Sequence, residues 1–219
     1  DLSDFTSLSS CFNAALGIFK SSLMPLAITV INSEANSRMG SIETQGPWTL
    51  LVRLGGRPLT LQRMITDSRN IIHNNDFSQE TMIDSDSSIP VWKSLSDFGW
   101  DEQTQPTLGI RVNVLPSTIP PLIKELVRLY GKNRIPTAIV AHPAHGTILA
   151  SWFTNDHTET DITIENLIEK TKTLVSRSGG NIVVENVPLV TKSRIDVWGD
   201  IDHPQSVVQG LKTQYDPNN

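Results

Sequence analysis

The chain has 219 residues, of which 38% are hydrophobic and 19% are charged, a composition that excludes an intrinsically disordered chain and predicts a packed core. Its 18 Lys and Arg against 23 Asp and Glu give a net charge of −5, so there is no general electrostatic attraction to nucleic acid or to an anionic membrane. The single cysteine, Cys11, excludes an internal disulfide and favours a reducing, cytoplasmic compartment.

The chain shows no transmembrane segment and no secretion signal. No apolar run approaches the roughly 20 residues that a spanning helix needs, and the first residues have neither a basic region nor a hydrophobic signal core. The first residue is Asp1 instead of Met, which indicates that the sequence begins inside a longer protein. Any membrane association would then come through partner subunits.

The first half of the chain predicts two strands and one helix. Residues 23–31 form an apolar, β-branched run, and residues 48–54 form a second strand that ends at Gly55 and Gly56. Pro58 then begins a helix with apolar residues at helical spacing. The polar residues 73–88 predict a surface loop with one edge strand.

The second half predicts six elements in a regular order. Residues 108–114 alternate apolar and other residues like a strand with one buried face, and residues 119–130 form an amphipathic helix that ends at Gly131. Residues 137–141 and 147–153 predict a hairpin around a turn at residues 143–146. A helix over residues 164–175 and a strand over residues 181–185 follow.

This order is that of a ferredoxin-like split βαβ unit over residues 108–185, and the first half begins a similar unit. The predicted fold class is therefore α+β, with ferredoxin-like units forming a mainly antiparallel sheet and helices on one face. The opposite face then requires another partner. We expect residues 1–219 to form a single domain.

Motifs for nucleotide binding and for nucleophilic catalysis are absent. No Gly-x-Gly-x-x-Gly follows a strand, no Gly-x-x-x-x-Gly-Lys-Ser/Thr occurs, and no Gly-x-Ser-x-Gly occurs. An independent enzyme would therefore depend on scattered histidines and carboxylates, which is weak ground for catalysis.

Two histidines flank the predicted hairpin turn. His142 and His145 could share a metal, and a neutral His142 also suits proton abstraction. The alternative is a pair of turn histidines bonded to backbone or solvent. Glu185, at the end of its strand, could be a third ligand or a solvated carboxylate.

Arg111 and Asn113 alternate with apolar residues in the strand at residues 108–114, so they project from the face opposite the helices. A guanidinium there can bind a substrate carboxylate through two hydrogen bonds, and Asn113 would add a neutral one. The alternative for Arg111 is an ion pair on an open sheet face.

Several strings, in order, resemble the C-terminal domain of FAD-linked oxidases of the vanillyl-alcohol oxidase type, in particular the branch that contains the FAD-linked subunits of glycolate oxidase. They are residues 111–116, the turn at residues 142–146, Gly179 and Gly180 with Val184, Glu185 and Pro188, then Lys192, residues 195–199, and residues 211–217. The resemblance covers the chain from about residue 108 to its end.

The resemblance implies a two-domain flavoprotein, an oxidoreductase in which an N-terminal domain holds FAD and this chain is the substrate-binding cap. The implied substrate is a small 2-hydroxy acid such as glycolate or D-lactate, bound by Arg111, Asn113, Glu185 and Lys192, with His142 as the catalytic residue. The implied partners are the FAD-binding domain, absent from this chain, and other oxidase subunits. The isolated chain is then expected to be inactive.

The sequence departs from relatives that use a divalent metal. Those relatives carry a Gly-His-x-Gly-Asp-Gly-Asn-Leu-His string and a later Glu-His pair. Here His142 keeps the first histidine, Leu149 replaces the second, and Asn186 follows Glu185. No metal is therefore expected, because zinc and manganese sites need at least three protein ligands.

Two other functions remain open. A non-catalytic ferredoxin-like module would use its open sheet face to bind a partner subunit, and large exposed apolar area on that face would favour it. A metal hydrolase would use His142 and His145.

Overall fold

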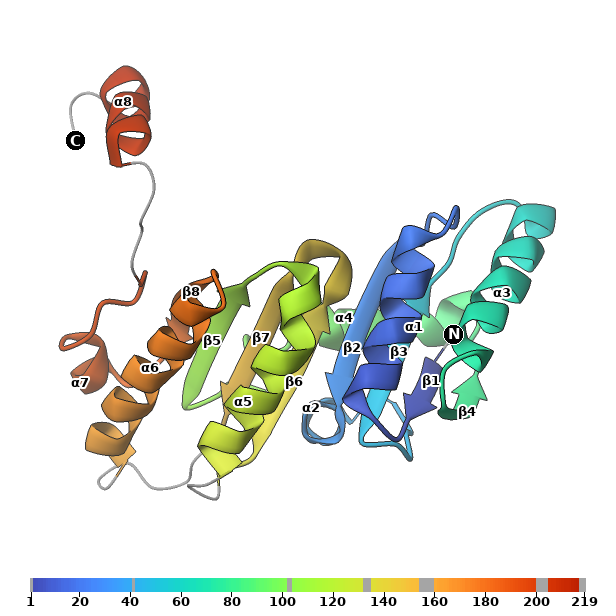
Figure 1. The fold of residues 1–219 in the computed structure, drawn as a ribbon, viewed down its shortest axis with the longest axis horizontal. Coiled ribbons are helices and arrows are strands. Elements are labelled where there is room, and N and C mark those ends of the chain that lie inside the picture. The colour runs from blue at the N-terminus through green and yellow to red at the C-terminus, as the bar shows by residue number, and fades with distance from the viewer. Residues whose placement is uncertain are drawn as a thin grey trace.

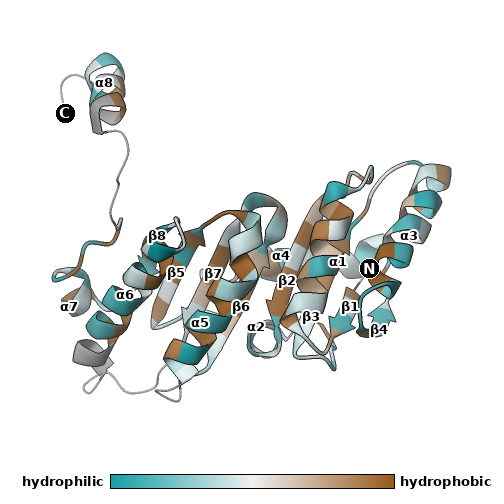
Figure 2. Cartoon of the chain, viewed as in Figure 1, coloured by the Kyte–Doolittle hydropathy of each residue, from teal (hydrophilic) through white to brown (hydrophobic). Residues whose placement is uncertain are grey.

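The strands of the computed structural model pair into one antiparallel sheet in the order β4-β1-β3-β2-β6-β7-β5-β8. The structure describes residues 2–40, 42–101, 104–131, 135–153, 160–199 and 205–216. The strands are β1 (Leu2–Phe5), β2 (Ala27–Asn32), β3 (Trp48–Arg53), β4 (Phe77–Thr81), β5 (Leu108–Asn113), β6 (Thr137–His142), β7 (Thr147–Trp152) and β8 (Asn181–Asn186). Figure 2 shows that β4, at one edge of the sheet, is hydrophilic while the central strand β2 is largely hydrophobic.

The sheet consists of two ferredoxin-like units side by side. The first contains β1 to β4 in the order β4-β1-β3-β2, and the second contains β5 to β8 in the order β6-β7-β5-β8. In each, two strand-helix-strand segments interleave, as the split βαβ motif requires. The α+β class and the mainly antiparallel sheet are therefore confirmed, and the first half completes the unit that its sequence only began to indicate.

Four crossover helices cover one face of the sheet, as predicted (Figure 1). They are α1 (Leu8–Lys20), α3 (Pro58–His73), α5 (Ile119–Gly131) and α6 (Thr160–Arg177). The main core lies between these helices and the strands, and it buries the predicted apolar residues of α5 and α6, such as Leu126 and Ile168. Ser7 begins α1 by accepting a hydrogen bond from the Ser10 amide, which the serine preference for this position explains.

Two shorter helices contact the opposite face. The helix α2 (Ser33–Met39) packs beside β6, and α4 (Ser85–Asp97) crosses the sheet with Val91 and Leu95 buried against it. The sequence prediction of a surface loop extending to residue 88 is therefore corrected from Ser85 onward. Pro90 and four serines give this segment little intrinsic helix propensity, so its formation depends on the apolar contacts of Val91 and Leu95.

Two regions lie beyond the sheet. The short helix α7 (Leu189–Lys192) contacts α6, and α8 (Gln205–Tyr215) stands apart from the sheet (Figure 1). Pro217, the last residue of the resemblance, lies outside the described residues. Within the described part of the chain, every helix is too short or too polar to span a bilayer.

The predicted hairpin turn between β6 and β7 is confirmed. A short 3-10 helix (Pro143–His145) and Gly146 connect the strands, and Gly146 has a φ of 70°. A Cβ at this position would also clash with the carbonyl oxygen of Val114, so the turn requires glycine twice over. This close approach fixes the turn, and with it His142, against the end of β5.

Candidate functional site

The candidate site is the part of the second sheet face that α4 leaves uncovered. Ile31, Leu51 and Val140 on this face are fully buried beneath α4, whereas Arg111 and Asn113 on β5 are exposed. The register places Arg111 opposite Leu149 and Asn113 opposite Thr147, which in turn pairs with His142. Residues opposite one another in an antiparallel sheet share a face. We call Arg111, Asn113, His142, Thr147 and Glu185 the open-face cluster.

Arg111 and Glu185 form an ion pair within this cluster. The Arg111 Nε donates to the Glu185 Oε1 at 2.6 Å, with side-chain exposures of 44% and 23%. The alternative of an ion pair on the sheet face is thus present in the structure. No other hydrogen bond from Arg111 occurs among the described residues, so both terminal nitrogens of its guanidinium remain available to a ligand.

A β-bulge places Glu185 beside Arg111. The register between β5 and β8 shifts after Gly109, which pairs with Asn186, while Ile110 pairs with Val184. Glu185 is therefore the extra residue, and bulges redirect side chains in this way. The carboxylate holds the guanidinium in place, which makes Glu185 a positioning residue for Arg111.

His142 ends β6 and lies on the same face. Its Nδ1 is 3.2 Å from the hydroxyl oxygen of Thr29, a buried residue of β2. Burial lowers the pKa of His142 below its usual value, and the positive charges of His145 and Arg111 lower it further. A neutral imidazole is therefore favoured near pH 7, and it can accept a proton.

Asn113 is held by its neighbour across the strand pair. The Thr147 hydroxyl donates to the Asn113 Oδ1 at 3.1 Å. The acceptor atom of the amide is therefore engaged, and its NH₂ group is left to donate to a ligand.

Lys192 is the one predicted site residue that the structure does not bring to the cluster. It ends α7, which contacts α6 on the helix-covered side of the sheet, and its side chain is exposed. The structure thus brings together Arg111, Asn113, His142 and Glu185 and leaves Lys192 outside.

Sequence reasoning missed three residues that border the open face. Trp100 is 69% exposed and lines a small hollow of about 20 Å³ with Glu185. Arg53, on β3, has its guanidinium 5.7 Å from the ring centre of Trp92 on α4. The sequence signals were an arginine at the end of a predicted strand and tryptophans within a polar segment, but neither gives a face without knowledge of α4.

The predicted histidine pair does not make a metal site on its own. His145 is exposed, while His142 turns toward Thr29 and Glu185 bonds to Arg111. Across the described ranges, no group of three or more His, Cys, Asp or Glu side chains is arranged to hold a metal.

Comparison with known proteins provides no family assignment. The chain matches no model of a known protein family, and it matches no curated protein. The resemblance of the second half to FAD-linked oxidases therefore stays a prediction from its motifs.

Proposed function

We propose that this chain is the substrate-binding cap of an FAD-linked 2-hydroxy-acid oxidase or dehydrogenase. The observation that carries the proposal is the state of Arg111, whose guanidinium is held through Nε and presents two free terminal nitrogens on an exposed sheet face. That arrangement suits a small carboxylate, which arginine binds through two parallel hydrogen bonds. The ordered motifs from residue 108 onward support the same function.

The cluster has a role for each part of a 2-hydroxy acid. Arg111 would bind the carboxylate, and the NH₂ group of Asn113 would donate to the acid's oxygen atoms. His142 stands two strands away, on β6, which is roughly 10 Å at the usual strand spacing. An extended arginine side chain crosses much of that gap, so an acid held by Arg111 could present its hydroxyl to the neutral imidazole, which would accept the proton.

The flavin, when bound, would take a hydride from the carbon that bears the hydroxyl. The open-face cluster fits the substrate beside a flavin ring, but it does not fit the pyrophosphate of FAD. A pyrophosphate needs backbone N–H groups or a helix N-terminus, and the cluster lies on the flat faces of strands. We therefore assign the binding of FAD mainly to another domain, and enclosure of the substrate to closure of that domain over the open face.

The same proposal includes location and assembly. The only cysteine, Cys11, is buried, and burial raises the pKa of its thiol well above the usual value, so it suits a reducing compartment as an inert core residue. We place the protein in the cytoplasm, with other oxidase subunits as its contacts to a membrane.

Ligand binding tests the cap directly. We expect D-lactate to shift the NMR signals of Arg111 and Asn113 in the isotope-labelled chain, and lactamide, which lacks the charge, to leave them unchanged. Arg111→Gln should abolish the response, while the control Arg128→Gln, on the opposite face, should retain it. In the complete flavoprotein, glycolate or D-lactate should bleach the flavin, and Arg111→Gln should raise KM by at least about tenfold. Equal responses to D-lactate and lactamide, or a flavin that no 2-hydroxy acid reduces, would refute the proposal.

One observation favours the alternative of a non-catalytic interaction module. Trp100 exposes most of its side chain beside the open face, and exposed tryptophans are frequent at the centres of protein interfaces. In that function Trp100→Ser would weaken assembly with a partner subunit, and Arg111→Gln would alter neither ligand binding nor flavin reduction.

A further inference from the structure

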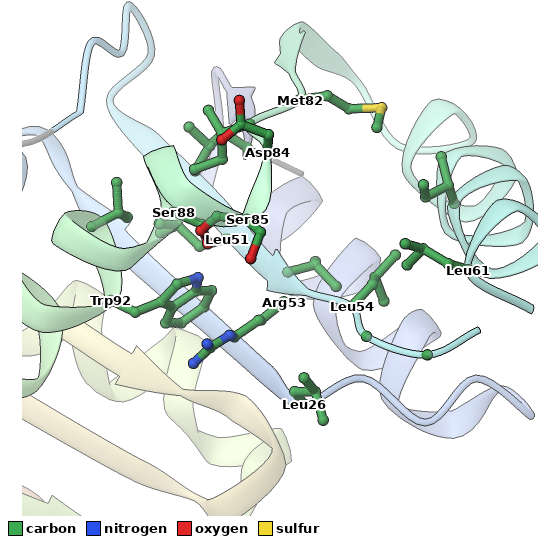
Figure 3. A pocket seen from close by; sticks show the side chains of 17 residues that line it. Leu26, Leu51, Arg53, Leu54, Leu61, Met82, Asp84, Ser85, Ser88 and Trp92 are labelled. Carbon is green, nitrogen blue, oxygen red and sulfur yellow. Dashed lines mark hydrogen bonds between the residues drawn. The ribbon is translucent and has the colours of Figure 1, made fainter. Parts of the chain in front are cut away.

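The largest pocket of the described chain lies in the first unit, away from Arg111. It has a volume of about 440 Å³ and lies between α3 on one face of the sheet and α4 on the other, at the end of β3 (Figure 3). That volume falls within the roughly 300–1,000 Å³ of small-molecule sites.

The walls of this pocket are mainly apolar. They come from α3, α4 and the loops beside β3, and the side chains include Leu26, Leu54, Leu61, Ile65, Met82 and Val91. Leu26 is 66% exposed and Met82 is 50% exposed. Large apolar side chains gathered around a hollow and left open to water are typical of a binding surface.

A cation marks one end of the pocket. The guanidinium of Arg53 lies beside the ring of Trp92, which holds it at the rim (Figure 3). No carboxylate among the described residues pairs with Arg53. An arginine stacked on an aromatic ring keeps its edge N–H groups free for a planar anion.

An anion marks a different part of the rim. Asp84 precedes α4 and accepts a hydrogen bond from the Ser87 amide at 2.8 Å. That backbone hydrogen bond lowers the pKa of Asp84, so its carboxylate is charged near neutral pH. A second anion entering the pocket is therefore repelled from Asp84 and attracted to Arg53, which defines the orientation of the ligand.

We infer that this pocket binds a medium-length aliphatic carboxylate, with its carboxylate on Arg53 and its chain between α3 and α4. The chain gains from removal of apolar surface from water, and the carboxylate gains a charge-assisted hydrogen bond. This inference concerns a site separate from the open-face cluster and does not rest on the proposed oxidase function.

Octanoate is the probe, and 1-octanol is the matched neutral ligand of the same length. We expect isothermal titration calorimetry to show octanoate binding at least about tenfold more tightly than 1-octanol. Arg53→Gln should reduce octanoate binding to the level of 1-octanol while leaving 1-octanol unchanged. Ser88→Phe, which fills the pocket from α4, should abolish both. The control Arg63→Gln, on the same α3 but paired with Asp67 outside the pocket lining, should alter neither.

Several results would overturn the inference. They are no octanoate binding, equal affinity for octanoate and 1-octanol, and octanoate binding that survives Arg53→Gln in full. Equal affinity would instead indicate a site for an uncharged apolar partner. Circular dichroism and thermal melting confirm that each variant is folded. Arg111→Gln should leave octanoate affinity unchanged, so failure of this inference and failure of the oxidase proposal are distinguishable.

Discussion

Asn32 joins the two ferredoxin-like units, and its removal is the most informative test of the architecture. The strands β2 and β6 share only two register pairs, Val30 with Ala141 and Ile31 with Val140. Next to these, the Asn32 amide continues the pairing with its side chain. Its Nδ2 donates to the Thr137 carbonyl at 2.7 Å, and its Oδ1 accepts from the Ile139 amide at 2.9 Å.

The same oxygen also begins α2 by accepting from the Ala35 amide at 3.0 Å. Asn32→Ala therefore loses a helix cap, at about 1 kcal/mol, and two further hydrogen bonds at about 1 kcal/mol each. The side chain is partly exposed, so water can reach some of the freed groups. We expect a loss of roughly 2–3 kcal/mol in the free energy of unfolding.

Asn32→Asp separates the cap from the joint. The carboxylate keeps the cap and the bond from Ile139, but it cannot donate to Thr137, and it sets oxygen against oxygen. We expect a loss of roughly 1–3 kcal/mol from the unpaired carbonyl alone. Asn181→Ala is the matched control, because Asn181 is exposed and its side chain makes no hydrogen bond within the described structure.

Urea unfolding followed by circular dichroism measures these differences, and hydrogen exchange at the Ile139 amide reports on the joint itself. Exchange there should accelerate in Asn32→Ala and stay unchanged in Asn181→Ala. If Asn32→Ala unfolds within about 0.5 kcal/mol of the unmodified chain, the side-chain amide does not stabilise the joint and the reasoning is wrong.

Three further predictions follow from other contacts. A double-mutant cycle of Arg111→Ala and Glu185→Ala should give a coupling below about 1 kcal/mol, because the pair is partly exposed; a coupling above about 2 kcal/mol would make Arg111 structural and unavailable to ligand. Thr171 already donates to a backbone carbonyl, so Tyr130 must donate to Thr171, and Tyr130→Phe should cost about 1 kcal/mol in urea unfolding, whereas no loss would show that this buried bond is unimportant. The pKa of His142 is lowered by folding, so the unfolded chain binds more protons just below its ordinary pKa; stability should fall as pH drops through about 6.5, and His142→Gln should flatten that slope in melts across the range.

Much of the second unit was predictable because its signals are local. The period-2 alternation in residues 108–114 correctly placed Arg111 and Asn113 on the face opposite the helices. Gly131, and the pair Gly179 and Gly180, marked helix ends near where they occur. Local periodicity reports which side of an element is buried, and it needs no knowledge of distant residues.

The first unit was less predictable. The helix at residues 8–20 has apolar residues at helical spacing and a serine cap, but no prediction covered that segment. The helix α4 lacks such a signal, because Pro90 and its serines disfavour a helix. Only the apolar sheet face beneath Val91 and Leu95 stabilises it.

By themselves, the residues determined the class of fold, the order of the second unit and the face on which Arg111 lies, since each depends on spacing within one element. Tertiary structure alone decided how that face is divided. It set α4 over one part of the sheet, brought Glu185 to Arg111 through a bulge, and placed Thr29 against His142 across 113 positions of sequence. Those contacts depend on register and strand order, which arise only when distant segments pack together.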